Sequence, residues 1–401
     1  MRPLEGYTVI DLTTFVAAPF CARLLSDMGA RVIKIETLKG DGWRGTGISM
    51  GAKRFSAAEN PVFDLYNSGK DLISLNLKTE EGMAIMHQLL SKADVFITNN
   101  RPAALKRLGL GYDDLKEKYP RLVYGIVLGF GEKGPDADKQ AYDTTAFWTR
   151  SGFLRDCSPL TEDYMPVTAP SSVGDSYTGT NLAMQVLAAL LLRQQTGRGQ
   201  YVKSSLYHVG VFAMASMTVR TQRPFGTKYP DTPWEIRPTA GAFQCADGEW
   251  LFVSTAPSQI FAVAGKPELM DDPAWWPENW ATTRKYRYDM MRSVLLTKTS
   301  DEWMELLTPL DTPTVKMPHF ADVSEDPQAW ANRYLEKVTY PTGFTHTIPT
   351  SPIEMECFDE PIVTQVTRCV GQDTKIILQE LGYSETQIQK MMDDGVVLCG
   401  Q

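Results

Sequence analysis

The residues best suited to chemistry lie around one aspartate in the stretch VGDSYTG, residues 173–179. Asp175 follows a glycine at the predicted start of a long helix, where an aspartate can cap the helix by accepting backbone N–H bonds. It can also act as a carboxylate nucleophile, because Gly174 and Gly179 would let a bulky substrate come close. The local residues favour the cap and leave the nucleophile as the alternative.

Nucleophilic attack by this aspartate would make strong demands on the fold. A carboxylate with a pKa of about 4 is a poor nucleophile in water. Holding both partners in an attack geometry recovers roughly 7–11 kcal/mol of such a barrier. The nucleophile hypothesis therefore predicts a firmly anchored substrate.

Other side chains that drive catalysis show no useful grouping. The histidines are His87, His208, His319 and His346, and none belongs to a metal-spaced cluster. The six cysteines are scattered without a C-x-x-C pair, and no serine or cysteine lies in a nucleophile elbow. We therefore expect neither a bound metal nor histidine-driven hydrolysis.

Three glycines have the spacing of a dinucleotide-binding motif. Gly129, Gly131 and Gly134 match G-x-G-x-x-G at the end of a strongly apolar run. That motif binds a pyrophosphate only when a helix begins inside it. The next residues, PDADKQ (135–140), have no apolar face at helical spacing. We interpret the glycines as a strand exit and expect no NAD or flavin.

Strands and helices alternate through the first half of the chain. Apolar patterns predict strands at 7–13, 30–36, 71–77, 94–99 and within 122–135, and amphipathic patterns predict helices at 19–29, 79–92, 101–109 and 112–119. This alternation predicts a parallel sheet covered on both faces. The first strand-to-helix turn lacks glycine, while Glu36 ends the second strand where dinucleotide folds place an acid for the ribose. The expected architecture is α/β and Rossmann-like without its glycine fingerprint.

The second half changes in composition. Residues 158–173 are rich in Pro, Ser and Thr and predict a loop, and residues 175–195 predict a long helix. Beyond about residue 220, Trp, Pro and Thr become frequent, and we interpret 225–320 as a smaller α+β domain. Residues 371–397 predict two amphipathic helices separated by Gly382.

Composition and charge exclude several classes of protein. The chain has 401 residues with 43% apolar content and a net charge of −8, which argues against a nucleic-acid partner. It shows neither a signal peptide at its start nor an apolar run of membrane-spanning length. We expect a cytoplasmic protein without a membrane partner, and the many cations in the first 110 residues predict binding of a small polyanion.

The ordered segments together resemble a known family. The segments are LEGYTVIDLT (4–13), GARVIKIE (29–36) followed by GDGWR (40–44), NSGKDLISLNLKTEEG (67–82) and LAALLLRQQTGRGQYV (187–202). This set resembles the class III CoA transferases (formyl-CoA transferase-like, CaiB/BaiF type), a family that includes α-methylacyl-CoA racemases. The resemblance implies a Rossmann-like CoA-binding domain in residues 1–224, a small α+β domain in 225–320, and a segment, 321–401, that completes the large domain. It also implies a homodimer of two interlocked, ring-like subunits.

The resemblance assigns roles to individual residues. Asp175 matches the aspartate that attacks the acyl-CoA thioester to give a mixed anhydride, which CoA thiolate converts to an aspartyl-CoA thioester before the incoming acid takes the CoA. Coenzyme A is thus the implied co-substrate, and Lys39 and Arg44 are further candidates for its phosphates. Tyr142 and Asp143 match the substrate pocket. The positions that match CoA-contacting residues are Val16, Ala17, Thr37, Leu75, Lys78, Asn99, Arg101 and Arg107.

Two departures from the family narrow the expected substrate. The racemase branch carries Gly-His-Asp where this chain has Ala141-Tyr142-Asp143, so the histidine for proton exchange is absent. The formyl-CoA branch has a polyglycine loop, whereas residues 237–250 hold no glycine run, and it has a glutamine where this chain has Val16. We expect a less polar pocket, to which the aromatic stretch 142–148 contributes unless it belongs to the core.

The strings KTEEG, YDDLKEKYPRLVYG and AYDTTAF resemble a branch that serves amino-acid fermentation. That branch moves CoA between 2-hydroxy acids and α,β-unsaturated acids, with phenyllactate/cinnamate and 2-hydroxyisocaproate/isocaprenoate as pairs. The alternatives are a racemase, a transferase for dicarboxylates, carnitine or bile acids, and a non-catalytic CoA-binding protein.

Overall fold

The computed structural model describes residues 1–46, 59–157, 169–222, 239–367 and 369–400. These residues fall into two compact units. Apart from the gaps just named, the first unit comprises residues 1–157, 169–222 and 327–400, and the second comprises residues 239–326. None of the helices in these ranges is long and apolar enough to cross a membrane. The predicted loop at 158–173 and the segment 237–250 lie partly outside the described residues.

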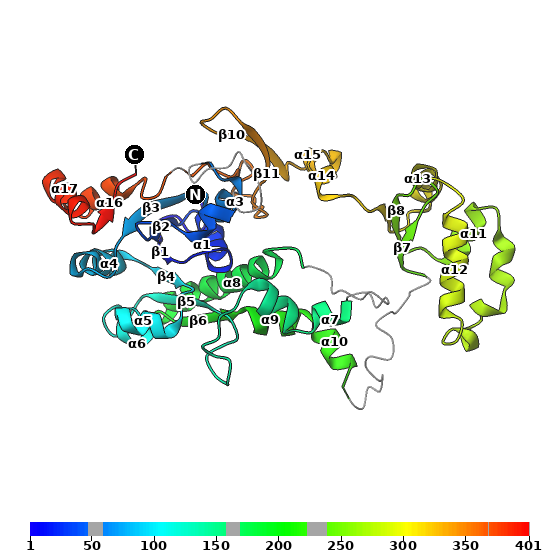
Figure 1. Cartoon of the computed structure of the whole chain (residues 1–401), viewed down its shortest axis with the longest axis horizontal. Helices are drawn as coiled ribbons and strands as arrows, with labels where there is room; N and C mark the ends of the chain where they lie inside the picture. Colours follow the sequence, from blue (N-terminus) through cyan, green and yellow to red (C-terminus); the bar gives the residue numbers. More distant parts are fainter. Residues whose placement is uncertain (47–58, 158–168, 223–238, 368, 401) are drawn as a thin grey trace. The chain divides into compact units, whose positions relative to one another are not determined.

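A seven-stranded sheet forms the centre of the first unit (Figure 1). Across the sheet lie β12 (Val397–Leu398), β3 (Lys70–Leu75), β2 (Arg31–Glu36), β1 (Thr8–Leu12), β4 (Val95–Thr98), β5 (Val123–Leu128) and β6 (Tyr201–Ser205). All neighbours pair in parallel except β12, which runs antiparallel to β3 at the edge. This confirms the expected α/β architecture, and the strand order reverses between β1 and β4, as in Rossmann-like folds.

Helices cover both faces of this sheet, as the alternating pattern predicts. On one face, α1 (Ala17–Asp27) and α8 (Val173–Thr196) bury an apolar cluster with strand residues such as Val9. On the other face, side chains such as Ile10 pack with a second set of helices. This set is α4 (Glu80–Lys92), α5 (Pro102–Leu108), α6 (Tyr112–Leu115), α16 (Thr374–Glu380) and α17 (Glu385–Asp393).

The C-terminal segment is built into the large sheet. The backbone N–H of Leu72 donates to the Asp373 carboxylate over 2.8 Å, and the N–H of Ser74 donates to the Thr374 hydroxyl over 3.0 Å. Gly382, at a φ of 95°, separates the two predicted terminal helices. The segment thereby adds strand β12 and two helices to a sheet made mostly from the first 128 residues.

Side chains cap the starts of several helices. Thr79 caps α4 by accepting from the Gly82 N–H, and Ser384 forms a capping box at α17. In α13 (Ser300–Leu307), Thr299 is the capping residue and forms a capping box with Glu302. The Ser300 hydroxyl donates to Asp247.

The remaining elements of the first unit surround the sheet. They are η1 (Gly42–Gly45), α3 (Pro61–Asn67), η2 (Asp143–Thr149), α7 (Phe153–Cys157), α9 (Leu206–Ala213), α10 (Ala215–Arg220), α15 (Pro327–Ala331) and the antiparallel hairpin β10 (Leu335–Thr339) and β11 (Thr345–Pro349). Helix α9 follows directly after β6 in the chain.

The second unit has its own core. Strands β7 (Gly241–Gln244), β8 (Trp250–Val253) and β9 (Thr314–Lys316) form an antiparallel sheet. Helices α11 (Pro257–Val263), α12 (Arg284–Leu295) and α13 pack on it around the fully buried Trp303, and α14 (Phe320–Val323) follows. This mixture of sheet and helices is of the expected α+β class.

Candidate functional site

A cavity of about 360 Å³ opens at the carboxyl ends of the central strands. Its walls come from residues that follow β1, β4 and β6 and from the end of β5. In open α/β sheets, ligands bind at the carboxyl ends of the strands where the strand order reverses. The cavity occupies that position, so the topology alone marks it as the candidate site.

The start of α8 places Asp175 in the cavity wall. Ser172 is the capping position, at a φ of 72°, and Asp175 is the third residue of the helix. The hypothesis that Asp175 is the N-cap is therefore wrong. Its place in the first turn still favours a negative charge, because the helix dipole is positive at this end.

The two glycines beside Asp175 make room for protein neighbours. A Cβ on Gly174 would lie 2.3 Å from Oδ1 of Asp143, and one on Gly179 would lie 2.3 Å from the carbonyl oxygen of Ala17 in α1. The expectation that these glycines admit substrate is thus wrong for both. Their function is to let η2 and α1 approach α8 closely, which sets the position of Asp175.

Asp143 and Asp175 form what we call the carboxylate pair. Asp143 is 5% exposed, and no Lys or Arg among the described residues forms an ion pair with its carboxylate. Burial raises the pKa of Asp143, although the Trp148 indole and nearby backbone N–H groups partly oppose this. Burial and then the negative charge of Asp143 raise the pKa of Asp175 to about 7. Asp175 is therefore poised to change its charge near neutral pH.

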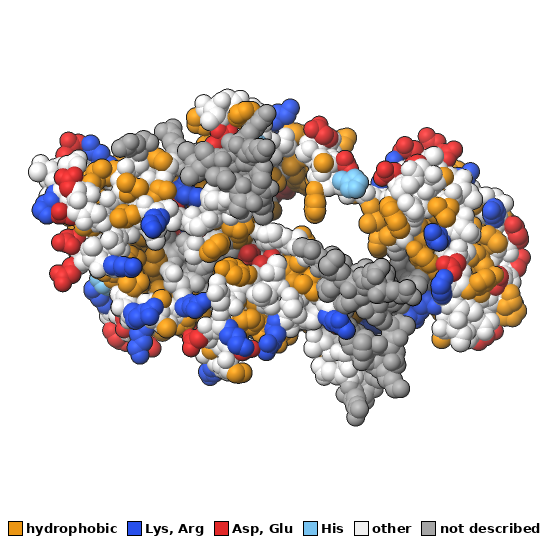
Figure 2. Space-filling model, viewed as in Figure 1, with side chains coloured by type: hydrophobic (Ala, Val, Ile, Leu, Met, Phe, Trp, Pro, Cys, Tyr) orange, Lys and Arg blue, Asp and Glu red, His pale blue; other side chains and the backbone are white. Residues whose placement is uncertain are grey.

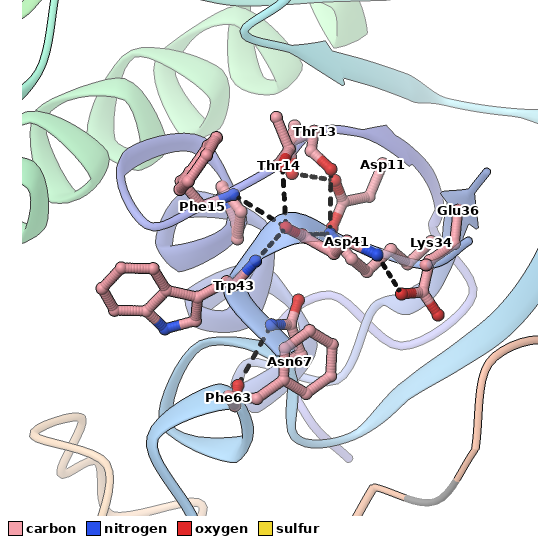
Figure 3. Close-up of polar contacts among 12 residues, drawn as sticks. Asp11, Thr13, Thr14, Phe15, Lys34, Glu36, Asp41, Trp43, Phe63 and Asn67 are labelled. Carbon is pink, nitrogen blue, oxygen red and sulfur yellow. Dashed lines mark hydrogen bonds and ion pairs between the residues drawn. The ribbon is translucent and has the colours of Figure 1, made fainter. Parts of the chain in front are cut away.

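The turn after β1 forms the opposite wall and is strained. Phe15 has a φ of 65°, which is uncommon for a bulky residue and costs on the order of 1–3 kcal/mol. Oδ1 of Asp41 holds the turn by accepting from the Thr14 hydroxyl (2.7 Å), the Phe15 N–H (3.1 Å) and the Trp43 N–H (2.9 Å). These contacts are shown in Figure 3.

Asn99, at the end of β4, clamps the same turn from the other side. Its amide oxygen accepts from the Thr14 N–H over 3.0 Å, and its amide nitrogen donates to the Thr14 carbonyl over 2.7 Å. Both polar groups of one backbone residue are thereby fixed. The cavity wall is preorganised by side chains where dinucleotide folds use glycines.

Beneath the turn lies a group of four buried charges, Asp11, Lys34, Asp41 and Lys70, which we call the paired cluster. Lys34 forms an ion pair with Asp41, and Lys70 forms one with Asp11, at 2.9 and 2.8 Å. Burial lowers the pKa of Lys70 to about 8, with Asp11 opposing the shift. Burial alone would lower the pKa of Lys34. The negative charges of Asp41, Asp11 and Glu36 outweigh burial, so the pKa of Lys34 is raised. Every charge of this cluster has an opposite partner.

Two residues near this cluster have roles other than those expected. Arg44 lies in η1 and is 4% exposed, and its guanidinium donates to both carboxylate oxygens of Glu36 over 2.7 and 2.9 Å. The ring of Phe63 also covers it. Arg44 is therefore no candidate for a CoA phosphate, and Glu36 is not free for a ribose hydroxyl.

The cavity gathers the larger part of the predicted site. Leu75 is 2% exposed and packs in the core, so its side chain offers no contact surface. Thr37, Lys78 and Arg107 are exposed outside the cavity lining. The predicted residues that line the cavity are Val16, Ala17, Asn99, Arg101, Tyr142, Asp143 and Asp175.

Several cavity residues were not predicted from the sequence. Phe15, Trp43 and Lys139 line the cavity, and the side chain of Lys139 pairs with Asp136. A positive φ at a phenylalanine has no sequence signal, although the run GDGWR contains the clamping Asp41. Of the aromatic stretch 142–148, Tyr142 lines the cavity, whereas Phe147 and Trp148 are buried in the core.

Cations lie on the surface near the site. Arg101 follows β4, is exposed and lines the cavity. Figure 2 shows further Lys and Arg side chains over the part of the first unit where Figure 1 labels α5 and α6. Three of the cations expected from the sequence, Arg101, Lys106 and Arg107, are exposed after β4. Such a surface suits a ligand with phosphate groups.

Comparisons with known proteins agree with one another. The model of CoA-transferase family III matches residues 4–374. The chain is 36% identical to (R)-2-hydroxy-4-methylpentanoate CoA-transferase of Clostridioides difficile, over 98% of this chain and 99% of the relative. It is 35% identical to cinnamoyl-CoA:phenyllactate CoA-transferase of Clostridium sporogenes, over 97% of this chain and 96% of the relative.

Solved structures show the same fold. The crystal structure of Rv3272 from Mycobacterium tuberculosis in its orthorhombic form matches with a TM-score of 0.79 at 26% identity, covering 94% of this chain and 99% of that chain. A CAIB/BAIF family protein from Brucella suis matches with a TM-score of 0.78 at 25% identity, covering 95% and 99%.

Proposed function

The chain belongs to CoA-transferase family III, as the sequence resemblance indicated, and we propose that it transfers CoA from an acyl-CoA to a carboxylic acid with Asp175 as the nucleophile. One observation carries the assignment of Asp175. Its carboxylate lines a cavity at the reversal point of the sheet, and its pKa is raised to about 7 by burial and by Asp143. A raised pKa makes the ionised form a better nucleophile than an ordinary carboxylate.

In each step of the proposed reaction one bond forms at an acyl carbon and one bond to that carbon breaks. The Asp175 carboxylate attacks the thioester carbon, and the C–S bond breaks to leave an acyl-aspartyl anhydride and CoA thiolate. The thiolate attacks the aspartyl carbonyl, which releases the donor acid and leaves an aspartyl-CoA thioester. The acceptor carboxylate attacks the carbonyl carbon of this thioester, and the C–S bond breaks to give a second anhydride and CoA thiolate. Thiolate then attacks the acceptor's acyl carbon and regenerates Asp175.

CoA would lie along the carboxyl edge of the sheet. Val16, Ala17, Asn99 and Arg101 line the cavity that holds the thioester. Parallel strands present their carboxyl ends at one edge, so residues that follow β2, β3 and β4 can contact the rest of the cofactor. Thr37, Lys78 and Arg107 are placed in that way and are exposed, and Lys39 is exposed beside Thr37.

The proposed substrates are a 2-hydroxy acid and an α,β-unsaturated acid. The relatives at 36% and 35% identity carry 2-hydroxy-4-methylpentanoate and cinnamoyl-CoA with phenyllactate in their names. Aromatic side chains at the cavity suit acyl groups of this kind. The pairs phenyllactate/cinnamate and 2-hydroxyisocaproate/isocaprenoate are therefore the first to test.

The proposal includes an interlocked homodimer, with residues 1–224 and 321–401 in the large domain and 225–320 in the small one. Tyr177, Met184 and Leu191 follow one another at seven-residue spacing on α8 and are 45%, 61% and 63% exposed. A row of exposed apolar side chains is typical of a contact surface. Light scattering should give the mass of two chains, and Met184→Glu should weaken the dimer. A stable wild-type monomer would contradict this part of the proposal.

A transfer assay tests the proposed function. With cinnamoyl-CoA and phenyllactate, we expect the wild type to form phenyllactyl-CoA and cinnamate, detected by liquid chromatography and mass spectrometry, and Asp175→Ala to form neither. A racemase would instead incorporate deuterium at carbon 2 of a 2-methylacyl-CoA without CoA transfer. A non-catalytic binding protein would bind CoA but yield no transfer with any donor.

A further inference from the structure

Three aromatic rings from separate segments meet at one wall of the cavity. The ring of Phe15 packs edge-on against Trp43, with centroids 6.3 Å apart, and against Tyr142, with centroids 6.0 Å apart. Phe15 and Tyr142 are 40% and 49% exposed, which is high for large rings in a folded unit. We call these three residues the aromatic wall. All of them line the cavity, so their exposed surface is available to a ligand there.

The rings of the wall are held in place before any ligand arrives. The Trp43 indole N–H donates to the Val62 carbonyl over 3.2 Å, and the Tyr142 hydroxyl accepts from the Gln140 amide over 2.8 Å. Asp41 fixes the backbone of the strained Phe15 turn. Figure 3 shows the Phe15 and Trp43 rings on the same side of that turn, away from Lys34. Strain retained in this way is typical of functional sites.

The position of Asp175 in the cavity determines which part of the substrate contacts these rings. Asp175 and the aromatic wall line the same cavity, whose volume of about 360 Å³ lies near the lower end of the range for ligand pockets, roughly 300–1,000 Å³. The thioester carbon must contact the Asp175 carboxylate for attack. The group that shares the cavity with this carboxylate is thus the acyl chain with the thiol end of CoA.

Resting on the proposed CoA transfer, we propose that Phe15, Trp43 and Tyr142 select acyl groups with an aromatic or branched apolar end over short or charged ones. An apolar acyl end gains dispersion and edge-to-face contacts with the rings. A carboxylate at the acyl end, as in succinyl-CoA, would lose hydration against the rings without gaining a partner from them. The aromatic wall is therefore the specificity determinant for the acyl group.

The selectivity of Phe15→Ala tests this proposal. We compare kcat/KM for cinnamoyl-CoA, succinyl-CoA and acetyl-CoA as donors to one acceptor. The ratio of kcat/KM for cinnamoyl-CoA to kcat/KM for acetyl-CoA should fall about tenfold or more. Trp43→Ala should change the ratio in the same direction. Phe344→Ala is the matched control, because Phe344 is also 40% exposed but lies in the β10–β11 hairpin outside the cavity lining, and it should leave the ratio unchanged.

Two results would overturn the specificity role. An unchanged ratio in both Phe15→Ala and Trp43→Ala would show that the rings do not contact the acyl group. An equal loss for all three donors would place the rings against the CoA moiety instead. The affinity for cinnamoyl-CoA relative to free CoA can be measured by calorimetry without turnover. The measurement compares Asp175→Asn with the double variant that also carries Phe15→Ala. It tests the wall even if the proposed transfer reaction fails.

Discussion

Two groups of buried charged side chains lie beside the cavity, and they differ in whether each charge has a partner of opposite sign. In the paired cluster beneath the β1 turn, each cation contacts a carboxylate within 3 Å. In the carboxylate pair, Asp143 of η2 and Asp175 of α8 lie close together, and neither forms an ion pair with a cation among the described residues. The ion pairs hold the backbone of the β1 turn in place, whereas the pKa values of the carboxylates without a cation partner are raised.

The contrast distinguishes buried charges that stabilise the fold from buried charges that can react. A buried ion pair loses its stabilising role as soon as one partner is removed. An unpaired buried carboxylate destabilises the folded state, so its retention at a cavity indicates function. The paired cluster therefore supports the site, and the carboxylate pair is the reactive part. Five predictions test the roles of these groups and of the cavity that they border.

The largest expected effect comes from the nucleophile. Asp175→Asn should lower kcat for CoA transfer by about four orders of magnitude or more, because no covalent intermediate can form. The unfolding midpoint should stay the same or rise, since a poorly solvated charge is removed. Asp138→Asn, an exposed aspartate outside the cavity lining, is the control and should keep wild-type activity. Residual transfer above a few per cent in Asp175→Asn would rule out the nucleophile.

Substitution of a lysine in the paired cluster should lower the stability of the folded protein. Lys70→Met leaves the carboxylate of Asp11 buried without its ion-pair partner, so the free energy of unfolding should fall by about 3–5 kcal/mol. Urea denaturation followed by fluorescence measures this change. Lys116→Met removes an exposed ion pair and should change the free energy of unfolding far less than Lys70→Met does. Equal effects of the two substitutions would remove the distinction between supporting and surface charges.

The pH dependence should separate the two carboxylates. Asp175 attacks in its ionised form, and its pKa of about 7 means that kcat/KM should rise with pH through neutrality. Asp143→Asn removes a neighbouring negative charge, which favours the ionised form of Asp175. The acid limb of the pH profile should therefore move to lower pH. A limb that stays in place would show that burial alone sets the pKa.

The raised pKa of Asp175 also has a consequence for stability. A carboxyl group with a pKa higher in the folded state than in the unfolded state binds its proton more tightly when folded. Its contribution therefore destabilises the fold as pH rises from about 4 to 7. In Asp175→Asn this contribution is absent, and the difference between variant and wild type should grow over that range and then level off.

The smallest effect is expected at the exposed cation of the cavity. Arg101→Ala should raise the KM for acyl-CoA about two- to fivefold, because a solvent-exposed charge contributes little to binding. The effect should shrink as salt is added. Arg198→Ala is the control, since Arg198 is exposed and lies outside the cavity lining. A loss that is insensitive to salt would indicate a buried, direct contact instead.

The sequence predicts those parts of the molecule that depend on local patterns. Alternating apolar segments identified the parallel sheet. Pairing across long distances was harder to predict, because the short strand β12 at the end of the chain pairs with β3, which lies more than 300 residues earlier in the sequence. The burial of Arg44 against Glu36 depends on tertiary packing and has no local signal.

For the site, the resemblance to a family supplied more than the residues did. Local reasoning made Asp175 a helix cap, whereas the helix begins at Ser172 and Val173. The glycines beside it looked like space for substrate, but they accommodate Asp143 and α1. The strained Phe15 could not be anticipated, since a positive φ at a phenylalanine is imposed by contacts with distant residues such as Asp41.

The most direct test of the account is the covalent state of Asp175 during turnover. The protein is incubated with cinnamoyl-CoA, quenched with hydroxylamine or borohydride, digested and examined by peptide mass spectrometry. The account predicts a modified side chain at Asp175, absent without acyl-CoA and absent in Asp175→Asn. An unmodified Asp175 in an enzyme that transfers CoA, or a modification at Asp143 in its place, would contradict it.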